Sequence, residues 1–278
     1  MMIFRTILSF HFLIIFTLSL DAQAPNPLRG HARRPKPSKL VFNYPIIRLE
    51  GGDFTMGSPD TATDRNDDEC HHNITIAAFG IGMYEISQDQ WTEVMGYNPS
   101  HFTGVTLPVE QVSWEEVQLF IKNLNEKTGK HYRLPTEAEW EFAAGGGSKN
   151  RTKYAGTNNP LELHKFANFY HPKTGTPIPI VNGEFVYPPT DGYQTTAPVK
   201  NYKPNSLGIY NMSGNVWEWC QDRYLPYDGC RSHDAALISR VVRGGSWVNS
   251  ARMCRVANRG LNAPELKYDL IGFRLAED

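Results

Sequence analysis

The side chains with the greatest chemical potential lie together in one stretch, residues 243–259. This stretch supplies a hydroxyl group, an indole ring, a carboxamide, a guanidinium group and a thiol, from Ser246, Trp247, Asn249, Arg252 and Cys254. A thiolate is both a nucleophile and a ligand for soft metal ions, so Cys254 could support covalent or redox chemistry. The alternative is a structural cysteine, because the cysteines of exported proteins are usually joined in disulfides.

A second candidate for chemistry is a pair of carboxylates. Glu137 and Glu141 are four residues apart in a segment expected to be helical, so they share one helix face. Such a pair could do acid–base work. A helix start rich in glutamate is also favoured by the helix dipole alone, and we favour this structural interpretation.

Three helices are predicted to position these groups. A short helix starts at Gln88, and a longer one covers 114–125, where Ser113 is the N-cap and apolar residues fall at helical spacing. The third helix follows Thr136, which has capping-box spacing to a glutamate, and it ends at the glycines 145–147.

Strands are predicted at 49–58, 74–79 and 81–86, and after residue 145 only at 241–243 and 272–275. Glycine, proline, asparagine and aromatic residues dominate the rest of this C-terminal half. The pattern indicates an irregular α+β fold with little regular secondary structure. A core of this kind needs disulfides or metal ions to hold it together.

The composition excludes some classes of partner. The chain has 278 residues, 40% of them hydrophobic and 21% charged, and a formal net charge of −1. These values describe a globular chain of one large domain. The charge gives no overall attraction to nucleic acid or to an anionic membrane.

The N-terminal sequence predicts export. Residues 1–22 combine a basic residue, a short apolar run and a small-residue end, as expected of a cleavable signal peptide. A retained anchor helix is the alternative, and no cysteine follows the run to carry a lipid. Residues 23–44 predict a proline-rich basic tether, and residues 45–278 the folded domain. We therefore expect a secreted or periplasmic protein with no membrane span after cleavage.

Four cysteines are available in that oxidising compartment, namely Cys70, Cys220, Cys230 and Cys254. They could form two disulfides, for which three pairings exist. The sequence does not choose among the three.

Five motifs in register resemble the formylglycine-generating enzyme family, also called sulfatase-modifying factors. The resemblance covers roughly residues 45–277 and rests on the segments 132–141, 205–210, 214–219, 243–247 and 272–274. It implies the irregular α+β fold of that family, which is related to C-type lectins. Trp217 and Trp219, within one of these motifs, are expected in the core.

The resemblance also implies two structural calcium sites built from oxygen donors. The first set comprises the side chains of Asn168 and Asp191 and the carbonyls of Phe169 and Tyr193. The second set comprises the side chains of Asn211 and Glu218 and the carbonyls of Gly214 and Val216. The alternative for the second set is a tight turn in which the side chains bond backbone amides.

The resemblance fails at the catalytic metal. Oxidases of the family bind copper(I) through two cysteines, the first two residues after the aromatic residue of the Arg-Gly-Gly-Ser-aromatic motif and the second five residues later. Here the first position is Asn249, whose amide oxygen cannot replace a thiolate for copper(I). Copper binding is therefore not expected.

The position of Cys254 depends on the direction of counting. From Trp247 it has the spacing of the second family cysteine, but counted back from the motif 255–259 the loop is three residues shorter and Cys254 is not the catalytic position. We favour the backward count. Cys254 is then structural and pairs with Cys220, leaving Cys70 and Cys230 as a second bridge or as free thiols.

Three functions follow. The first is a calcium-stabilised binding or structural subunit of an envelope or surface assembly, with a protein partner. The second is an oxidase of different chemistry that tailors a small molecule or peptide in the same cleft, near Ser246, Trp247, Asn249 and Arg252. The third, a formylglycine-generating oxidase acting on a sulfatase cysteine, is disfavoured by Asn249.

Overall fold

The computed structural model describes residues 40–149, 151–170, 191–227, 230 and 238–278, together with the backbone of two short strands, β6 (Ile178–Pro179) and β7 (Phe185–Val186). The predicted signal peptide, 1–22, and all but the last five residues of the predicted tether, 23–44, lie outside these residues. Residues from Lys39 to Asp278 form one compact unit.

Two four-stranded sheets organise the domain. One has the order β1 (Ile46–Leu49), β4 (Phe79–Gly82), β12 (Ala276–Glu277) and β5 (Tyr132–Arg133), with antiparallel pairing throughout. The C-terminal strand therefore lies in the middle of a sheet made largely by the first third of the chain. A separate hairpin joins β2 (Gly52–Met56) to β3 (His72–Ile76).

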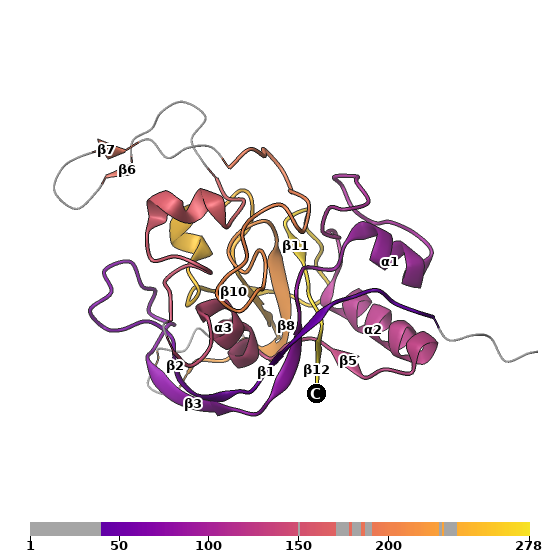
Figure 1. The fold of residues 1–278 in the computed structure, drawn as a ribbon, viewed down its shortest axis with the longest axis horizontal. Coiled ribbons are helices and arrows are strands. Elements are labelled where there is room, and N and C mark those ends of the chain that lie inside the picture. Colours follow the sequence, from indigo (N-terminus) through magenta and orange to yellow (C-terminus); the bar gives the residue numbers. More distant parts are fainter. Residues whose placement is uncertain are drawn as a thin grey trace, which may run out of the picture. The chain divides into compact units, whose positions relative to one another are not determined.

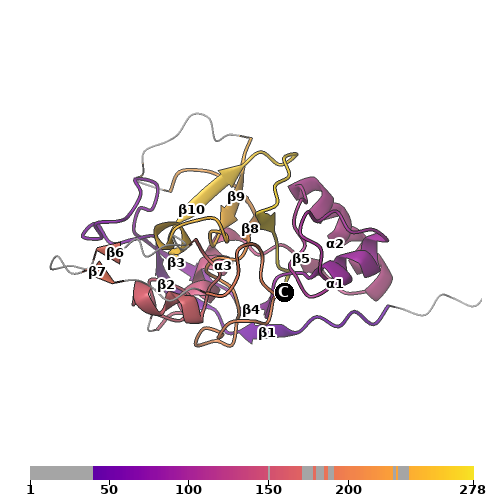
Figure 2. The same ribbon diagram turned by 90° about the horizontal axis from the view of Figure 1, so that it is seen from above.

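The second sheet carries the motif residues. Its order is β10 (Arg259–Asn262), β9 (Arg240–Arg243), β8 (Trp217–Arg223) and β11 (Ile271–Gly272), and only the β8–β11 pair is parallel (Figures 1 and 2). The loop that carries the candidate residues Ser246 to Cys254 connects β9 to β10, so its two ends are held in neighbouring strands.

Helix α1 (Gln88–Met95) and helix α2 (Trp114–Thr128) lie side by side (Figures 1 and 2). Their boundaries confirm the predicted starts, and the Ser113 hydroxyl accepts a hydrogen bond from the Glu116 amide. The apolar face of α2 is fully covered, and Trp91 of α1 stacks on Phe120 of α2 with ring centroids 5.1 Å apart. Apolar burial thus fixes this helix pair.

Helix α3 (Glu137–Gly145) lies between the β2–β3 hairpin and the second sheet (Figure 1). It begins with the predicted capping box, in which Thr136 accepts from the Glu139 amide, and ends at Gly146 in a left-handed conformation. Eight of its nine residues are buried, including both glutamates of the predicted pair.

The rest of the described residues are irregular, apart from the short 3-10 helices η1 (Pro160–Lys165) and η3 (Ala251–Cys254). This confirms the expected α+β class. No helix of the described residues has the length and apolar character needed to cross a membrane.

Two strand predictions were wrong. The segment 272–275 is not one strand, because β11 pairs with β8 and β12 pairs with β4 and β5, with buried Phe273 and Leu275 passing between the two sheets. The seven-residue strand β8 was not predicted. Its Trp217 and Trp219 are buried in the core, as expected.

The cysteine pairing was also wrong in part. Cys70 and Cys230 form a disulfide. Of the two alternatives given for these cysteines, a bridge or free thiols, the bridge is confirmed. Cys220 and Cys254, predicted to pair, are both free and buried. They belong to different apolar clusters, Cys220 beside Trp140 and Val241, and Cys254 beside Phe169 and its neighbours.

Candidate functional site

The loop after β9 is closed by a local turn. The amide and hydroxyl of Ser246 both donate to the side-chain oxygen of Asn249, at 3.0 and 2.8 Å, and the Asn249 amide donates back to the Ser246 carbonyl at 2.9 Å. Asn249 therefore has a structural role at the position where the related oxidases carry a thiolate. A carboxamide oxygen engaged in this way has no affinity for copper(I).

Cys254 lies beneath this loop, fully buried. Gly245 is in the left-handed region (φ +74°), and a Cβ there would stand 2.8 Å from the Cys254 sulfur. Burial raises the pKa of the Cys254 thiol well above its ordinary value, with a further contribution from the charge of Asp191. A neutral thiol that solvent does not reach is neither a nucleophile nor a copper ligand.

The other cleft candidates point to different neighbours. The Trp247 ring packs edge-on against Phe102 with centroids 5.5 Å apart, and its indole nitrogen faces the Asp269 carbonyl at 3.4 Å. Arg252 donates to the side chain of Asn66 at 2.6 Å. Among the five candidate side chains, the hydrogen bonds of the described residues join only Ser246 and Asn249.

The structure draws attention to a carboxyl group that the sequence reasoning missed. Glu110 is fully buried, one of its oxygens accepts from the Phe102 amide at 2.8 Å, and the other has no hydrogen-bond partner. Burial, with a smaller contribution from the negative charge of Asp269, raises its pKa to about 7. The one signal for this group in the sequence was the position of a glutamate between the apolar residues Val109 and Val112, which are buried in the structure.

Glu85 is a second buried carboxyl group, placed beside the second calcium set. It accepts from the side-chain amides of Asn211 and Asn215 at 2.9 and 2.8 Å. Burial raises its pKa to about 7, although the charge of Arg274 acts in the opposite direction.

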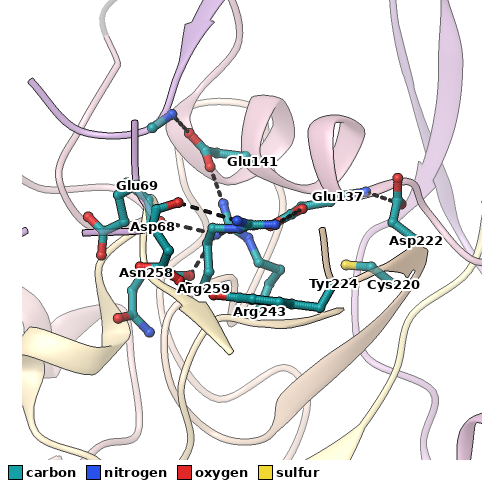
Figure 3. Close-up of polar contacts among 12 residues, drawn as sticks. Asp68, Glu69, Glu137, Glu141, Cys220, Asp222, Tyr224, Arg243, Asn258 and Arg259 are labelled. Atoms are coloured by element: carbon teal, nitrogen blue, oxygen red, sulfur yellow. Dashed lines mark hydrogen bonds and ion pairs between the residues drawn. The ribbon is translucent and has the colours of Figure 1, made fainter. Parts of the chain in front are cut away.

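The glutamates of α3 belong to a buried ion-pair network, not to an acid–base site (Figure 3). Glu137 receives two hydrogen bonds from Arg259, at 2.7 and 2.9 Å, and Glu141 is paired with both Arg243 and Arg151. Burial alone would raise the pKa of Glu141, but the guanidinium groups of Arg151 and Arg243 outweigh it and hold that pKa below its ordinary value. Buried carboxylates that are each paired with arginines suit a structural role.

The first calcium set fits a bound cation. The side-chain oxygen of Asn168 is buried without a hydrogen-bond partner, and the next residue, Phe169, donates its amide to the Asp191 carboxylate at 2.8 Å. The Tyr193 amide donates to the same carboxylate at 3.1 Å. The four members of the set are therefore brought together, with a hard oxygen left over for an ion.

The second set fits less well. The side-chain oxygen of Asn211 is also buried and unpartnered. However, Arg274 donates to both oxygens of Glu218, at 2.6 Å each, and the Trp140 indole donates to one of them at 2.7 Å. A guanidinium already neutralises the only carboxylate of this set. A calcium ion would have to share Glu218 with that positive charge.

Gly214, a member of the second calcium set, packs against Asn168 of the first set. It has φ +77°, and a Cβ there would stand 2.1 Å from the Asn168 carbonyl, which accepts from the Asn215 amide at 2.7 Å. Within the described residues, no group of three or more His, Cys, Asp or Glu side chains is arranged to hold a metal ion. An ion at the first set would therefore be held by one carboxylate, that of Asp191, together with carboxamide and carbonyl oxygens.

Comparison with known proteins identifies the family. The model of the sulfatase-modifying factor enzyme 1-like domain matches residues 33–278. Chaperone protein LppX of Paenibacillus barcinonensis is 33% identical over 252 residues, which cover 77% of this chain and 82% of that protein.

In two further relatives, the matched region makes up about half of the relative's length. The formylglycine-generating enzyme of Streptomyces coelicolor is 38% identical over 182 residues, 62% of this chain and 52% of that protein. The inactive C-alpha-formylglycine-generating enzyme 2 of Mus musculus is 31% identical over 194 residues, 67% of this chain and 54% of that protein.

Solved structures share the fold over most of the chain. Treponema denticola variable protein 1 is 28% identical with a TM-score of 0.70, covering 86% of this chain and 98% of that one. PvdO from Pseudomonas aeruginosa is 28% identical with a TM-score of 0.67, covering 84% and 94%. This chain belongs to the formylglycine-generating enzyme, or sulfatase-modifying factor, family, as a divergent member without the complete cysteine pair.

Proposed function

We propose that this protein is an exported family member without formylglycine-generating activity, and that it serves as a binding or structural subunit of an envelope or surface assembly. The observation that carries the proposal is the loop after β9. Asn249 occupies the first thiolate position and is bound to Ser246, while the only nearby thiol, Cys254, is buried and neutral. A linear two-thiolate copper(I) site has no ligands here.

Two features support export and a protein partner. The Cys70–Cys230 disulfide closes a separation of 160 residues, and disulfides persist mainly in oxidising compartments. One relative is named a chaperone protein, which supports a protein partner, and another is named an inactive formylglycine-generating enzyme, which supports the absence of that activity.

We propose that calcium stabilises the domain through the first set of oxygen donors. Asn168 and Asp191 would supply side-chain oxygens, and Phe169 and Tyr193 would supply carbonyls. The support is the buried, unpartnered oxygen of Asn168 beside an oriented carboxylate. Bound calcium would hold the loop at 168–169 against the segment 191–193.

The test of the main proposal is a conversion assay on a peptide that carries a sulfatase-type cysteine motif. The peptide is incubated with the purified protein, copper and oxygen, and formylglycine is measured by mass spectrometry, with the Streptomyces coelicolor enzyme as positive control. We expect no product above the enzyme-free background. Conversion that Cys254→Ser abolishes would overturn the proposal.

A second candidate, tailoring of a small molecule or peptide in the same cleft, is favoured by one specific observation. Glu110 has a free buried oxygen and a pKa near neutrality, and its neighbour Phe102 packs against Trp247. A group with that pKa could transfer protons at neutral pH, but because Glu110 is fully buried a substrate would reach it only if the surrounding chain opened. Oxygen consumption with a candidate substrate, lost in Glu110→Gln but kept in Glu115→Gln on the surface of α2, would establish this function instead.

A further inference from the structure

A pocket of about 460 Å³ opens between the loop 57–64 after β2, His71, residues 151–153, and residues 255–257 after η3. No residue of the motif loop 244–254 lines it. The pocket is therefore separate from the candidate residues of the motif loop, such as Ser246 and Asn249.

Positive charge predominates in its lining. Arg151, Lys153 and Arg255 line the pocket, and Asp64 is the only carboxylate that does so. Lys153 contacts Asp64 at 2.7 Å, and Arg255 lies 3.7 Å from the same carboxylate. The Asp64 carboxylate is thus the ion-pair partner of two cations at the pocket.

The buried network behind the pocket does not remove this excess. Glu141 is shared by Arg151 and Arg243, and Glu137 by Arg243 and Arg259, whereas Glu69 belongs to Arg255 alone. Figure 3 shows the Arg243, Glu141, Glu137 and Arg259 part of this network.

Five cations therefore share four carboxylates in the ion pairs of the described residues around the pocket. Asp68, a fifth carboxylate near the same arginines, accepts a hydrogen bond from the Tyr224 hydroxyl and does not line the pocket. The excess of positive charge is therefore a property of the pocket wall, where three cations stand against one carboxylate.

Hydrogen-bond donors are available at the same place. The exposed Thr61 and Thr63 line the pocket, and neither hydroxyl has a partner among the described residues. The side chain of Lys153 is 40% exposed, so its ammonium group can turn from Asp64 to a ligand. Arg255 is bound to Glu69 at 2.7 Å and contributes its charge from behind.

We propose that this pocket binds a small ligand through an oxyanion, a carboxylate, sulfate or phosphate group. Lys153 is the direct charged contact, the hydroxyls of Thr61 and Thr63 donate hydrogen bonds, and the ligand replaces Asp64 as the partner of Lys153. An oxyanion is the chemistry that satisfies both a surplus cation and free hydroxyl donors. The volume leaves room for a ligand larger than an inorganic ion.

The test compares variants whose effects have opposite signs. Binding of sodium sulfate, phosphate and acetate to the full protein is measured by isothermal titration calorimetry at constant ionic strength, which distinguishes the three sources of the oxyanion. Lys153→Gln should weaken binding at least tenfold, and Asp64→Asn should tighten it several-fold because it removes the competing carboxylate. Both side chains are partly exposed, so both variants should fold.

Lys165→Gln is the matched control, because Lys165 is 41% exposed and also paired with a carboxylate, Glu162 at 2.8 Å. It should bind each anion as the unmodified protein does. The proposal is overturned if none of the three anions binds saturably up to about 50 mM, if Asp64→Asn weakens binding, or if Lys165→Gln loses as much affinity as Lys153→Gln. Tight binding of one anion class alone would assign the ligand to that class.

Discussion

Replacing Glu218 by glutamine should destabilise the protein whether or not calcium is present. Both Glu218 and Arg274 are fully buried, and Arg274 donates to both carboxylate oxygens at 2.6 Å. The remaining donors of Arg274 reach the carbonyls of Gly82 and Tyr210 at 3.0 and 2.9 Å. This guanidinium therefore joins β8 to the first sheet and to the loop before Asn211.

The expected magnitude follows from the loss of one buried charge. Removing one partner of a buried ion pair leaves the other uncompensated and costs about 3–5 kcal/mol. For a domain of this size, a loss of 1 kcal/mol lowers the melting temperature by about 2–4 °C. Glu218→Gln should therefore melt at a temperature lower by about 6–20 °C.

The assay is urea unfolding followed by tryptophan fluorescence, in calcium and in EDTA. Glu162→Gln, in the exposed pair with Lys165, is the control and should unfold as the unmodified protein does. A Glu218→Gln loss smaller than about 1 kcal/mol would refute the buried-pair account. A loss seen only in calcium would show that Glu218 is a calcium ligand and that Arg274 is not its main partner.

Four further experiments test other parts of the structure. Asp191→Asn should abolish the rise in melting temperature that calcium gives, measured by calorimetry, and leave the melting in EDTA nearly unchanged. Burial raises the pKa of Glu110 from its ordinary 4.5 to about 7, so the folded protein binds more protons in that window and its free energy of unfolding should rise as pH falls from 7 to 4.5. Glu110→Gln should reduce this slope by up to about 1.4 kcal/mol per pH unit and leave the part that Glu85 contributes, and an unchanged slope would show that Glu110 does not titrate in this range. Cys70→Ser should cost about 2–5 kcal/mol in urea unfolding. The thiols of Cys220 and Cys254 should react with a thiol reagent only after unfolding, and rapid reaction of the native protein would contradict their burial.

Local signals allowed the helices to be predicted. Ser113 and Thr136 cap their helices through bonds to residues three positions on, and a sequence window contains both partners. These features depend on neighbours in sequence.

The missed features depend on distant residues. Strand β8 pairs with β9 and with β11, about 50 residues away in the chain, and its residues gave no clear alternation of their own. The cysteine pairing joins positions 160 residues apart, and the predicted partner of Cys254 lies in another apolar cluster. The raised pKa of Glu110 requires the burial and the Asp269 charge that only the folded chain supplies.

The most direct test of the central claim, that the copper site has been lost, is a copper(I) titration of the native protein against a competing chelator. The account predicts that the chelator retains all the copper, because Asn249 is bound to Ser246 and Cys254 is buried and neutral. Tight one-to-one binding of copper(I) that disappears in Cys254→Ser would contradict it.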